Sequence, residues 1–211
     1  SGFVGRALTR ALAARGHVVR VALRPGQPEP APGVERAEID DLRNPVAWPR
    51  LLADATAIVH LAARAHQIDE TGAAAAATAA SMNTDLTRGL ATAARSVGAT
   101  RFVFMSSAGA QEAGQRFAAG TTLERLWRER PYQTSKLAAE RVLTALARPG
   151  FAPVSLRANS RSTSSPAACT VVSADWCARA RSLAVVRQWS RARLVPTKNT
   201  QARGSRTESQ R

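Results

Sequence analysis

The chain has 211 residues, enough for one α/β domain with a substantial core and too few for two. No apolar run approaches the roughly 18–20 residues that span a bilayer, and the start has no signal-peptide pattern, so we expect a cytoplasmic protein without a membrane partner. The net charge of +15 is unevenly distributed, because residues 155–211 carry 11 of the 30 basic residues but only 2 of the 15 acidic ones. Most of the excess positive charge therefore lies in the last quarter of the chain, which argues against nucleic acid as a partner of residues 1–154.

The first 40 residues predict the start of an alternating helix and strand pattern. Gly2 and Gly5 form a glycine-rich turn that leads into an amphipathic helix over residues 6–15, ended by Gly16. Residues 17–23 are rich in β-branched side chains and predict a strand. A short extended segment is expected over residues 34–40.

The alternation continues as far as residue 156. Asn44 and Pro45 are typical of a helix start and predict a helix through about residue 53. Further strands are expected at 57–63, 101–105 and 153–156, and further helices at 73–97, before Gly98, and at 132–146. Because such alternation requires crossovers between strands that run the same way, residues 1–157 are expected to form an α/β, doubly wound parallel sheet of the Rossmann-like type.

Residues 158–211 form a basic tail rich in Arg and Ser, and its last 15 residues contain no large apolar side chain. Such a segment is poor core material, so we expect it to be disordered or read out of frame. A divergent substrate domain and a genuine nucleic-acid-binding tail are the alternatives, although only Trp176 and Trp189 supply the aromatic rings that a dedicated reader uses. Cys169 and Cys177 form no CxxC pair and lie far from the histidines, so no metal site is predicted.

The strongest chemical signal is Tyr132 followed four residues later by Lys136. Tyr132 is the only tyrosine, and Lys136 is the only lysine before Lys198 in a chain that otherwise uses Arg. Positions i and i+4 of a helix share a face, so the ammonium lies near the phenol and favours its ionised form. A compact amine can also reach ribose hydroxyls that the rigid fork of Arg would crowd.

The pair Ser106 and Ser107 precedes Tyr132, with Ser107 25 residues before it. Together with the glycine turn, Tyr132 and Lys136, this pair gives the chain a pattern that resembles the extended short-chain dehydrogenase/reductase family of the NAD-dependent epimerase/dehydratase type. The resemblance covers residues 1–157. It implies a cofactor site that uses oriented N–H groups at a helix start for the pyrophosphate. The residues matched to that site are Gly2, Phe3, Val4, Gly5, Arg24, Asp41, Leu42, Leu61, Ala62, Ala63, Ser106, Tyr132 and Lys136.

The resemblance also implies a reaction. Tyr132 would be the general base on a substrate hydroxyl while a hydride leaves the same carbon for the nicotinamide. Ser107 would hydrogen-bond the substrate oxygen, and Lys136 would hold the cofactor and lower the tyrosine pKa. The implied substrate is a nucleotide sugar, but epimerisation, dehydration and reduction would share these residues.

The cofactor is NAD or NADP. An acidic residue at the end of the second strand would accept the ribose 2′-hydroxyl of NAD, but Arg24 stands there, where it could pair with the 2′-phosphate of NADP. For Asp41, a helix-capping role is an alternative to a contact with the adenine. His66 resembles a loop residue of sugar-nucleotide members, and Asn83 a helix residue that braces the active-site strand, with a plain surface role as the alternative for each.

The chain departs from the family at both ends. The family has an apolar strand and a further glycine before the position of Ser1, and after Arg157 it continues into a substrate domain that is absent or not recognisable here. We therefore expect little activity from the chain as given. A non-catalytic dinucleotide-binding or redox-sensing protein of the same fold and an inactive fragment are the alternatives. Family members often form homodimers through a helix bundle that would include the Tyr132 helix.

Overall fold

The computed structural model describes residues 2–63, 70–158 and 183–186. The strands are β1 (Val19–Leu23), β2 (Val34–Glu38), β3 (Ala57–His60), β4 (Arg101–Ser107), β5 (Ala152–Ala158) and β6 (Leu183–Val186). The helices are α1 (Phe3–Ala13), the 3-10 turn η1 (Pro45–Ala47), α2 (Trp48–Leu52), α3 (Ala73–Ala79), the π-helix η2 (Ala80–Asp85), α4 (Leu86–Ser96), α5 (Ala108–Ala118), α6 (Leu123–Glu129) and α7 (Pro131–Leu146).

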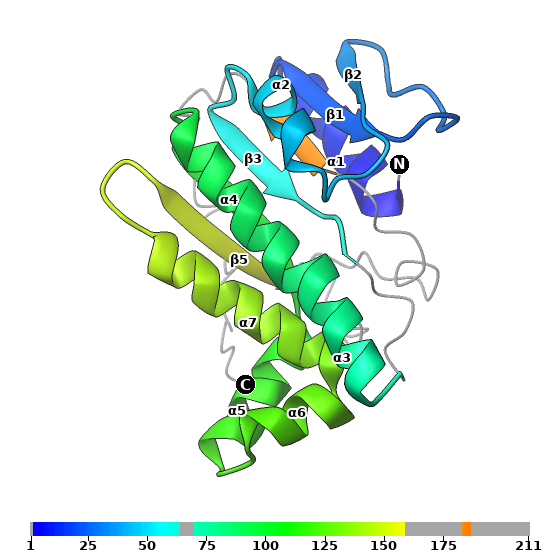
Figure 1. The fold of residues 1–211 in the computed structure, drawn as a ribbon. Coiled ribbons are helices and arrows are strands. Elements are labelled where there is room, and N and C mark those ends of the chain that lie inside the picture. Colours follow the sequence, from blue (N-terminus) through cyan, green and yellow to red (C-terminus); the bar gives the residue numbers. More distant parts are fainter. Residues whose placement is uncertain (1, 64–69, 159–182, 187–211) are drawn as a thin grey trace, which may run out of the picture.

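The strands form one sheet in the order β2-β1-β6-β3-β4-β5 (Figure 1). β1 pairs with β2, β3 with β4, and β4 with β5, all in parallel, which confirms the expected doubly wound α/β architecture. β6 lies between β1 and β3 and runs antiparallel to both, an addition that the sequence did not predict. Because the other strands are parallel, their carboxyl ends meet at one edge.

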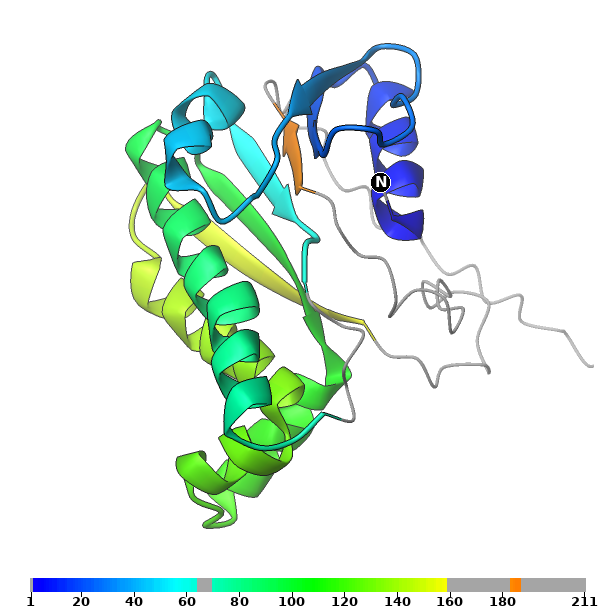
Figure 2. The same cartoon turned by 45° about the vertical axis from the view of Figure 1, so that its right-hand side comes forward.

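Helices cover both faces of the sheet (Figure 2). One face packs against α2, α4 and α7 and forms the largest apolar cluster, in which the fully buried members include Ile58, Leu90, Phe102, Phe104 and Leu143. On the other face, Leu12 of α1 packs with the apolar residues of β1. The alternation of strands and helices in the sequence therefore yields the layered core that it predicts.

Several expected element ends are confirmed by backbone geometry. Gly16 after α1 and Gly98 after α4 have φ values of 78° and 83°, the left-handed region that glycine enters without penalty. The Asn44 side chain caps η1 by accepting from the N–H of Val46 at 3.1 Å. The expected helix at 73–97 is present as α3, η2 and α4, with a π-helical turn in its middle.

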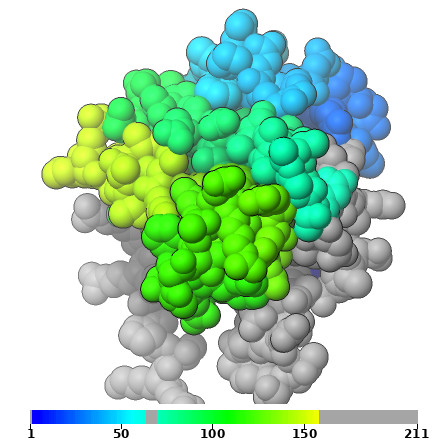
Figure 3. Space-filling view, turned by 60° about the horizontal axis from the view of Figure 1, so that its bottom comes forward, coloured from blue at the N-terminus to red at the C-terminus, as the bar shows by residue number. Residues whose placement is uncertain are grey.

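Helices α5 and α6 were not predicted. Together they form a lobe beyond the carboxyl end of β4, shown in green in Figure 3 beside the start of α3. The N–H of Gly72, just before α3, donates to the carbonyl oxygen of Arg128 in α6 at 2.8 Å, and α6 also contacts α7. This lobe therefore supports the first turn of α7, where Tyr132 lies.

Most of the basic tail lies outside the described residues, which include only Ala158 and β6 from residues 158–211. Its predicted disorder or frame error therefore stays a prediction. None of the described helices is long and apolar enough to cross a bilayer. The described residues also contain no cluster of three or more His, Cys, Asp or Glu side chains that could hold a metal ion.

Candidate functional site

The glycine turn begins helix α1 at the carboxyl edge of the sheet. Gly2 is the N-cap residue, and its carbonyl oxygen accepts from the N–H of Arg6 at 3.0 Å. Gly5 is buried within the helix, and Phe3 is 52% exposed. Val4 packs against the apolar cluster that contains Leu61, as does Met105 of β4. The turn thus lies close to the ends of β3 and β4, with no Cβ at the cap to obstruct an approaching phosphate.

Arg24 and Asp41 follow β1 and β2 at the same edge. The N–H of Ile39 donates to the carbonyl oxygen of Leu23 at 2.9 Å, which ties the two strand ends together. Arg24 is exposed, and its charge contributes to lowering the pKa of Asp41. A cation and an anion therefore flank the position expected for the adenosine end of a dinucleotide.

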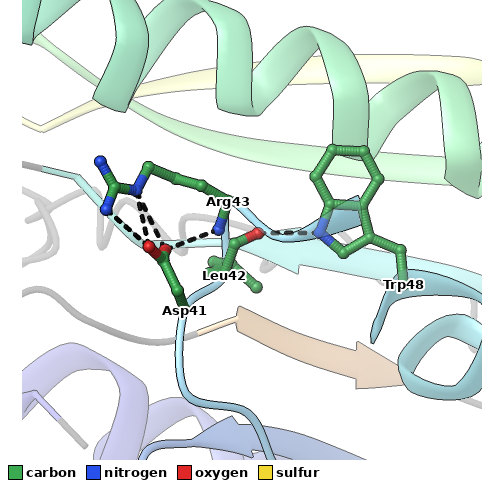
Figure 4. Close-up of polar contacts among 4 residues, drawn as sticks. All are labelled: Asp41, Leu42, Arg43 and Trp48. Carbon is green, nitrogen blue, oxygen red and sulfur yellow. Dashed lines mark hydrogen bonds and ion pairs between the residues drawn. The ribbon is translucent and has the colours of Figure 1, made fainter. Parts of the chain in front are cut away.

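The loop of Asp41 is held by its own neighbours (Figure 4). Asp41 accepts hydrogen bonds from the side chain of Arg43 and, at 2.9 Å, from its backbone N–H, and these bonds are the main cause of the lowered Asp41 pKa. The indole Nε1 of Trp48 donates to the carbonyl oxygen of Leu42 at 2.8 Å. Asp41 is thus a turn-capping carboxylate in this structure, and Leu42 is fixed beside it.

The end of β3 supplies the small residues expected there. Leu61 is buried, and Ala62 and Ala63 are partly exposed. His60, which the sequence did not single out, is fully buried, and its Nε2 lies 3.1 Å from the hydroxyl of Thr87 in α4. Burial, together with the nearby charge of Lys136, lowers the His60 pKa to about 3, so the imidazole is neutral.

The serine pair ends β4, with the two side chains in different environments. Ser106 is buried, whereas Ser107 is partly exposed and caps α5, its Oγ accepting from the N–H of Gly109 at 3.2 Å. A Cβ added at Gly109 would lie 2.6 Å from Cγ of Gln133 and 3.5 Å from the Ser107 hydroxyl. Ser107 and Gln133, the residue after Tyr132, therefore both lie close to this glycine.

Tyr132 and Lys136 occupy the first two turns of α7, which begins with Pro131. Tyr132 is 6% exposed and Lys136 is 2% exposed. The Lys136 Nζ donates to the carbonyl oxygen of Met105 at 2.9 Å and lies 4.5 Å from the centroid of the Phe104 ring. Burial lowers the Lys136 pKa to about 7, although the charge of Glu140 opposes that shift.

Asn83 lies in the π-helical turn and is 1% exposed, so the surface alternative for it is wrong. Its Nδ2 donates to the hydroxyl of Ser135 at 2.9 Å, and this hydroxyl donates to the carbonyl oxygen of Tyr132 at 2.7 Å. These contacts brace the Tyr132 helix. A π-turn of this kind is frequent at functional sites.

The structure gathers the sequence-predicted residues from several strand ends at one edge, as open α/β sheets do at ligand sites. His66 lies outside the described residues. Besides His60, the sequence did not single out Glu140 and Arg157, which form an ion pair between α7 and β5. The signal available for Glu140 was its position four residues after Lys136, the same helical face.

Comparison with a family model settles the family. The model of the NAD dependent epimerase/dehydratase family matches residues 1–178. The chain belongs to this family. A search among curated proteins finds no match.

Several solved structures share the fold of this chain. A short-chain dehydrogenase/reductase superfamily protein from Agrobacterium tumefaciens with bound NAD is 28% identical, with a TM-score of 0.55, and the match covers 74% of this chain and 46% of that one. MoeE5 in complex with UDP-glucuronic acid and NAD is 26% identical, with a TM-score of 0.52 and coverage of 74% and 51%. WbmG from Bordetella bronchiseptica, in complex with NAD and UDP, has a TM-score of 0.55 at 22% identity and coverage of 74% and 49%, and this likeness shows the fold alone. The chain spans about half the length of these structures.

The residues of this epimerase/dehydratase family member fit a dinucleotide. A glycine begins α1, a second glycine is buried one turn later, and the buried Lys136 amine lies at the carboxyl edge of the sheet. Among the described residues, the buried Ser106 hydroxyl makes no hydrogen bond of good geometry, although it lies near enough to the Glu140 carboxylate to help lower the pKa of that group.

Proposed function

We propose that this chain forms the NAD-binding part of an epimerase/dehydratase that acts on a nucleotide sugar, with Tyr132, Lys136 and Ser107 as its catalytic residues. One observation carries the proposal. The amine of Lys136 is buried one turn after Tyr132 and bonded to the carbonyl oxygen of Met105, where β4 reaches the edge of the sheet. Burying an ammonium costs free energy, so a fold without a use for it would place an apolar side chain there.

The cofactor residues follow from their positions at that edge. The start of α1 at Gly2 and the buried Gly5 would hold the pyrophosphate through backbone N–H groups and the helix dipole. Asp41 and Leu42 would border the adenine, and Ala62 and Ala63 the nicotinamide half. When bound, NAD supplies a hydride acceptor.

NAD is favoured as the cofactor because MoeE5 and the Agrobacterium protein, both more than 25% identical to this chain, were crystallised with it. Arg24 at the end of β1 has the charge that would pair with a 2′-phosphate, so NADP is the second candidate. The nucleotide sugar is supported by the UDP-glucuronic acid of the MoeE5 structure.

The chain's own residues would divide the proton chemistry among them. Tyr132 would take the proton of a substrate hydroxyl as the carbon that bears it loses a hydride, so that the hydroxyl becomes a carbonyl. Ser107 would donate a hydrogen bond to that oxygen. Lys136 would favour the phenolate by its charge, a role that depends on the amine being protonated near neutral pH.

Hydride transfer tests this assignment directly. The chain would be mixed with NAD and with UDP-glucose or UDP-glucuronic acid, and NADH would be followed by its absorbance. Because little activity is expected from the chain as given, we expect NADH to form slowly and within a single turnover. The rate should fall by at least about 100-fold in Tyr132→Phe, which removes only the base. Ser96→Ala, which removes an exposed hydroxyl from α4, is the matched control and keeps the wild-type rate. Equal rates in wild type and Tyr132→Phe would contradict the role of Tyr132.

A further inference from the structure

Arg157 of β5 clamps Glu140, which lies on the same helix as Lys136. Glu140 lies one turn after Lys136 on α7, and its side chain is 11% exposed. The guanidinium of Arg157 holds both carboxylate oxygens, with Nε at 3.0 Å from Oε1 and Nη2 at 2.6 Å from Oε2. Such a two-point contact fixes the carboxylate in orientation as well as in place.

The sheet fixes the other side of this clamp. Arg157 lies in β5 and is paired in register with Ser106 of β4, one residue after the Met105 carbonyl that accepts from Lys136. The ion pair therefore joins α7 to the end of β5, which is itself paired with the end of β4. Both strand ends lie at the edge of the sheet where the proposed substrate and cofactor bind.

We propose that Glu140 is a positioning residue for Lys136: its carboxylate, clamped by Arg157, is the counter-charge that keeps the buried amine protonated and bonded to the end of β4. The inference deepens the proposed function, on which its catalytic meaning rests. It assigns to the Glu140–Arg157 pair a role in preparing the site, beyond joining a helix to a strand.

The charges around Lys136 support this role. Burial strongly disfavours the ammonium, and the Glu140 charge is the influence that opposes the loss of its proton. Burial also works against the Glu140 carboxylate, but hydrogen bonding to Arg157, the nearby Ser106 hydroxyl and the charges of Arg157 and Lys136 together lower the Glu140 pKa. Glu140 is therefore a stable anion throughout the neutral range.

Within residues 2–63, 70–158 and 183–186, the other groups facing Lys136 supply no second anion. From β3, His60 is neutral, since its pKa is about 3. From β4, Phe104 offers its ring face, and Met105 a carbonyl oxygen. Tyr132 shares the face of α7, and it is the group on which the charge of Lys136 would act.

The chain offers a direct measurement, because Lys136 and Lys198 are its two lysines. Protein labelled with ¹³C at the lysine side chain would give two Cε resonances, and Lys136→Met identifies the one that belongs to Lys136. We expect the Lys136 resonance of the wild-type chain to titrate near pH 7. In Glu140→Gln the midpoint should fall by about one unit or more, as expected from loss of a neighbouring opposite charge.

Two variants separate positioning from general stabilisation. Glu124→Gln removes a carboxylate whose side chain is 89% exposed on α6, and should leave the Lys136 midpoint unchanged. Glu140→Asp keeps the charge on a shorter stem and should give a midpoint between those of wild type and Glu140→Gln; it also supplies the measurement if the glutamine variant does not fold. A Lys136 midpoint that stays at the wild-type value in the folded Glu140 variants overturns the proposal, whatever happens to their melting temperatures.

Binding of NAD provides the functional readout. At pH 7 we expect Glu140→Gln to weaken NAD binding by about three- to tenfold, because a smaller fraction of Lys136 is protonated. Lowering the pH should restore the NAD affinity of this variant, because Lys136 then regains its proton. An affinity that Glu140→Gln leaves unchanged would overturn the positioning role. If the wild-type chain binds no NAD, the proposed function fails, while the lysine titration still decides whether Glu140 keeps the amine charged.

Discussion

Asn83 and Ser135 are joined by a buried hydrogen bond of 2.9 Å that links the π-helical turn between α3 and α4 to helix α7. Ser135 passes the contact on by donating to the carbonyl oxygen of Tyr132, and Thr84 donates to the carbonyl oxygen of Ser135 at 3.0 Å. The first turn of α7 is thus fixed from a second helix, at the residue proposed as the base.

Asn83→Ala should lower the free energy of unfolding by about 1–3 kcal/mol, because it leaves the buried Ser135 hydroxyl without one of its partners. Urea denaturation followed by circular dichroism would measure the change. Ser96→Ala removes a hydroxyl that is exposed and bonded within its own helix, and should change stability by less than about 0.5 kcal/mol. Equal changes in the free energy of unfolding for the two substitutions would show that the buried hydrogen bond stabilises the fold no more than the exposed one does.

Gly89→Ala tests the support of the Asp41 loop. A Cβ at Gly89 in α4 would overlap the indole ring of Trp48, coming within 2.7 Å of Cζ3. Since Trp48 also holds the carbonyl oxygen of Leu42, the displaced ring should loosen the loop that borders the proposed adenine position. We expect a loss of about 1–3 kcal/mol in stability, measured by thermal denaturation, and weaker NAD binding.

The matched control is Gly114→Ala in α5. There the added Cβ would meet Leu137 at an ordinary 3.7 Å, so the better helix propensity of Ala should stabilise the chain by up to about 1 kcal/mol. If Gly89→Ala were also stabilising, the packing of Trp48 against α4 would be looser than described.

The stability of the fold should depend on pH through Lys136. Its pKa is lowered to about 7 by burial, against a usual value of 10.5, so between these values the unfolded chain keeps a proton that the folded chain releases. The contribution of Lys136 to the free energy of unfolding therefore rises with pH from about 7 to about 10.5.

Lys136→Met should remove this dependence and raise stability at pH 7 by on the order of 2–4 kcal/mol, because no charge is then buried. Chemical denaturation at pH 7 and pH 10 would measure both effects. A variant less stable than the wild type at pH 7 would contradict the burial cost assigned to the ammonium.

The sequence predicted the alternating core of this fold well, for a physical reason. Apart from His60 and Arg101, runs such as residues 57–63 and 101–105 are apolar, and a buried strand of a parallel sheet needs such a pattern. The glycine stops at Gly16 and Gly98 were equally readable, because a left-handed residue after a helix favours glycine.

Elements that depend on tertiary contacts were not predictable. Helix α5 contains Gly109 and Gly114, which lower its intrinsic propensity, and it packs on α7 through Ala110, Ala113 and Leu137. The π-turn at Asn83 and the place of β6 in the sheet also depend on partners distant in the sequence.

Part of the candidate site was likewise visible only in three dimensions. The spacing of Tyr132 and Lys136 indicated a shared helical face, but it did not show that the amine would be bonded to Met105. Arg157 contacts Glu140 across 17 positions of sequence, a pairing that no local pattern encodes.

Arg24→Asp should change the choice between the two nicotinamide cofactors. A carboxylate at the end of β1 would accept the ribose 2′-hydroxyl of NAD and repel a 2′-phosphate, so we expect the ratio of NAD to NADP affinity to rise about tenfold or more. Arg101→Asp makes the same charge change on an exposed side chain at the start of β4, at the edge of the sheet opposite to Arg24. It should leave the ratio of NAD to NADP affinity as in the wild type. A ratio unaffected by Arg24→Asp would place the ribose elsewhere.

The most direct test of the proposed dinucleotide site is a calorimetric titration of the wild-type chain and of Lys136→Met with NAD at pH 7. We predict saturable binding to the wild-type chain and a loss of affinity of at least about tenfold in the variant, because the amine would hold ribose hydroxyls at the edge of the sheet. Since Lys136→Met is expected to be the more stable protein, unfolding cannot account for such a loss. No binding by the wild-type chain at millimolar NAD, or equal affinity in both proteins, would contradict the assignment of this edge as the cofactor site.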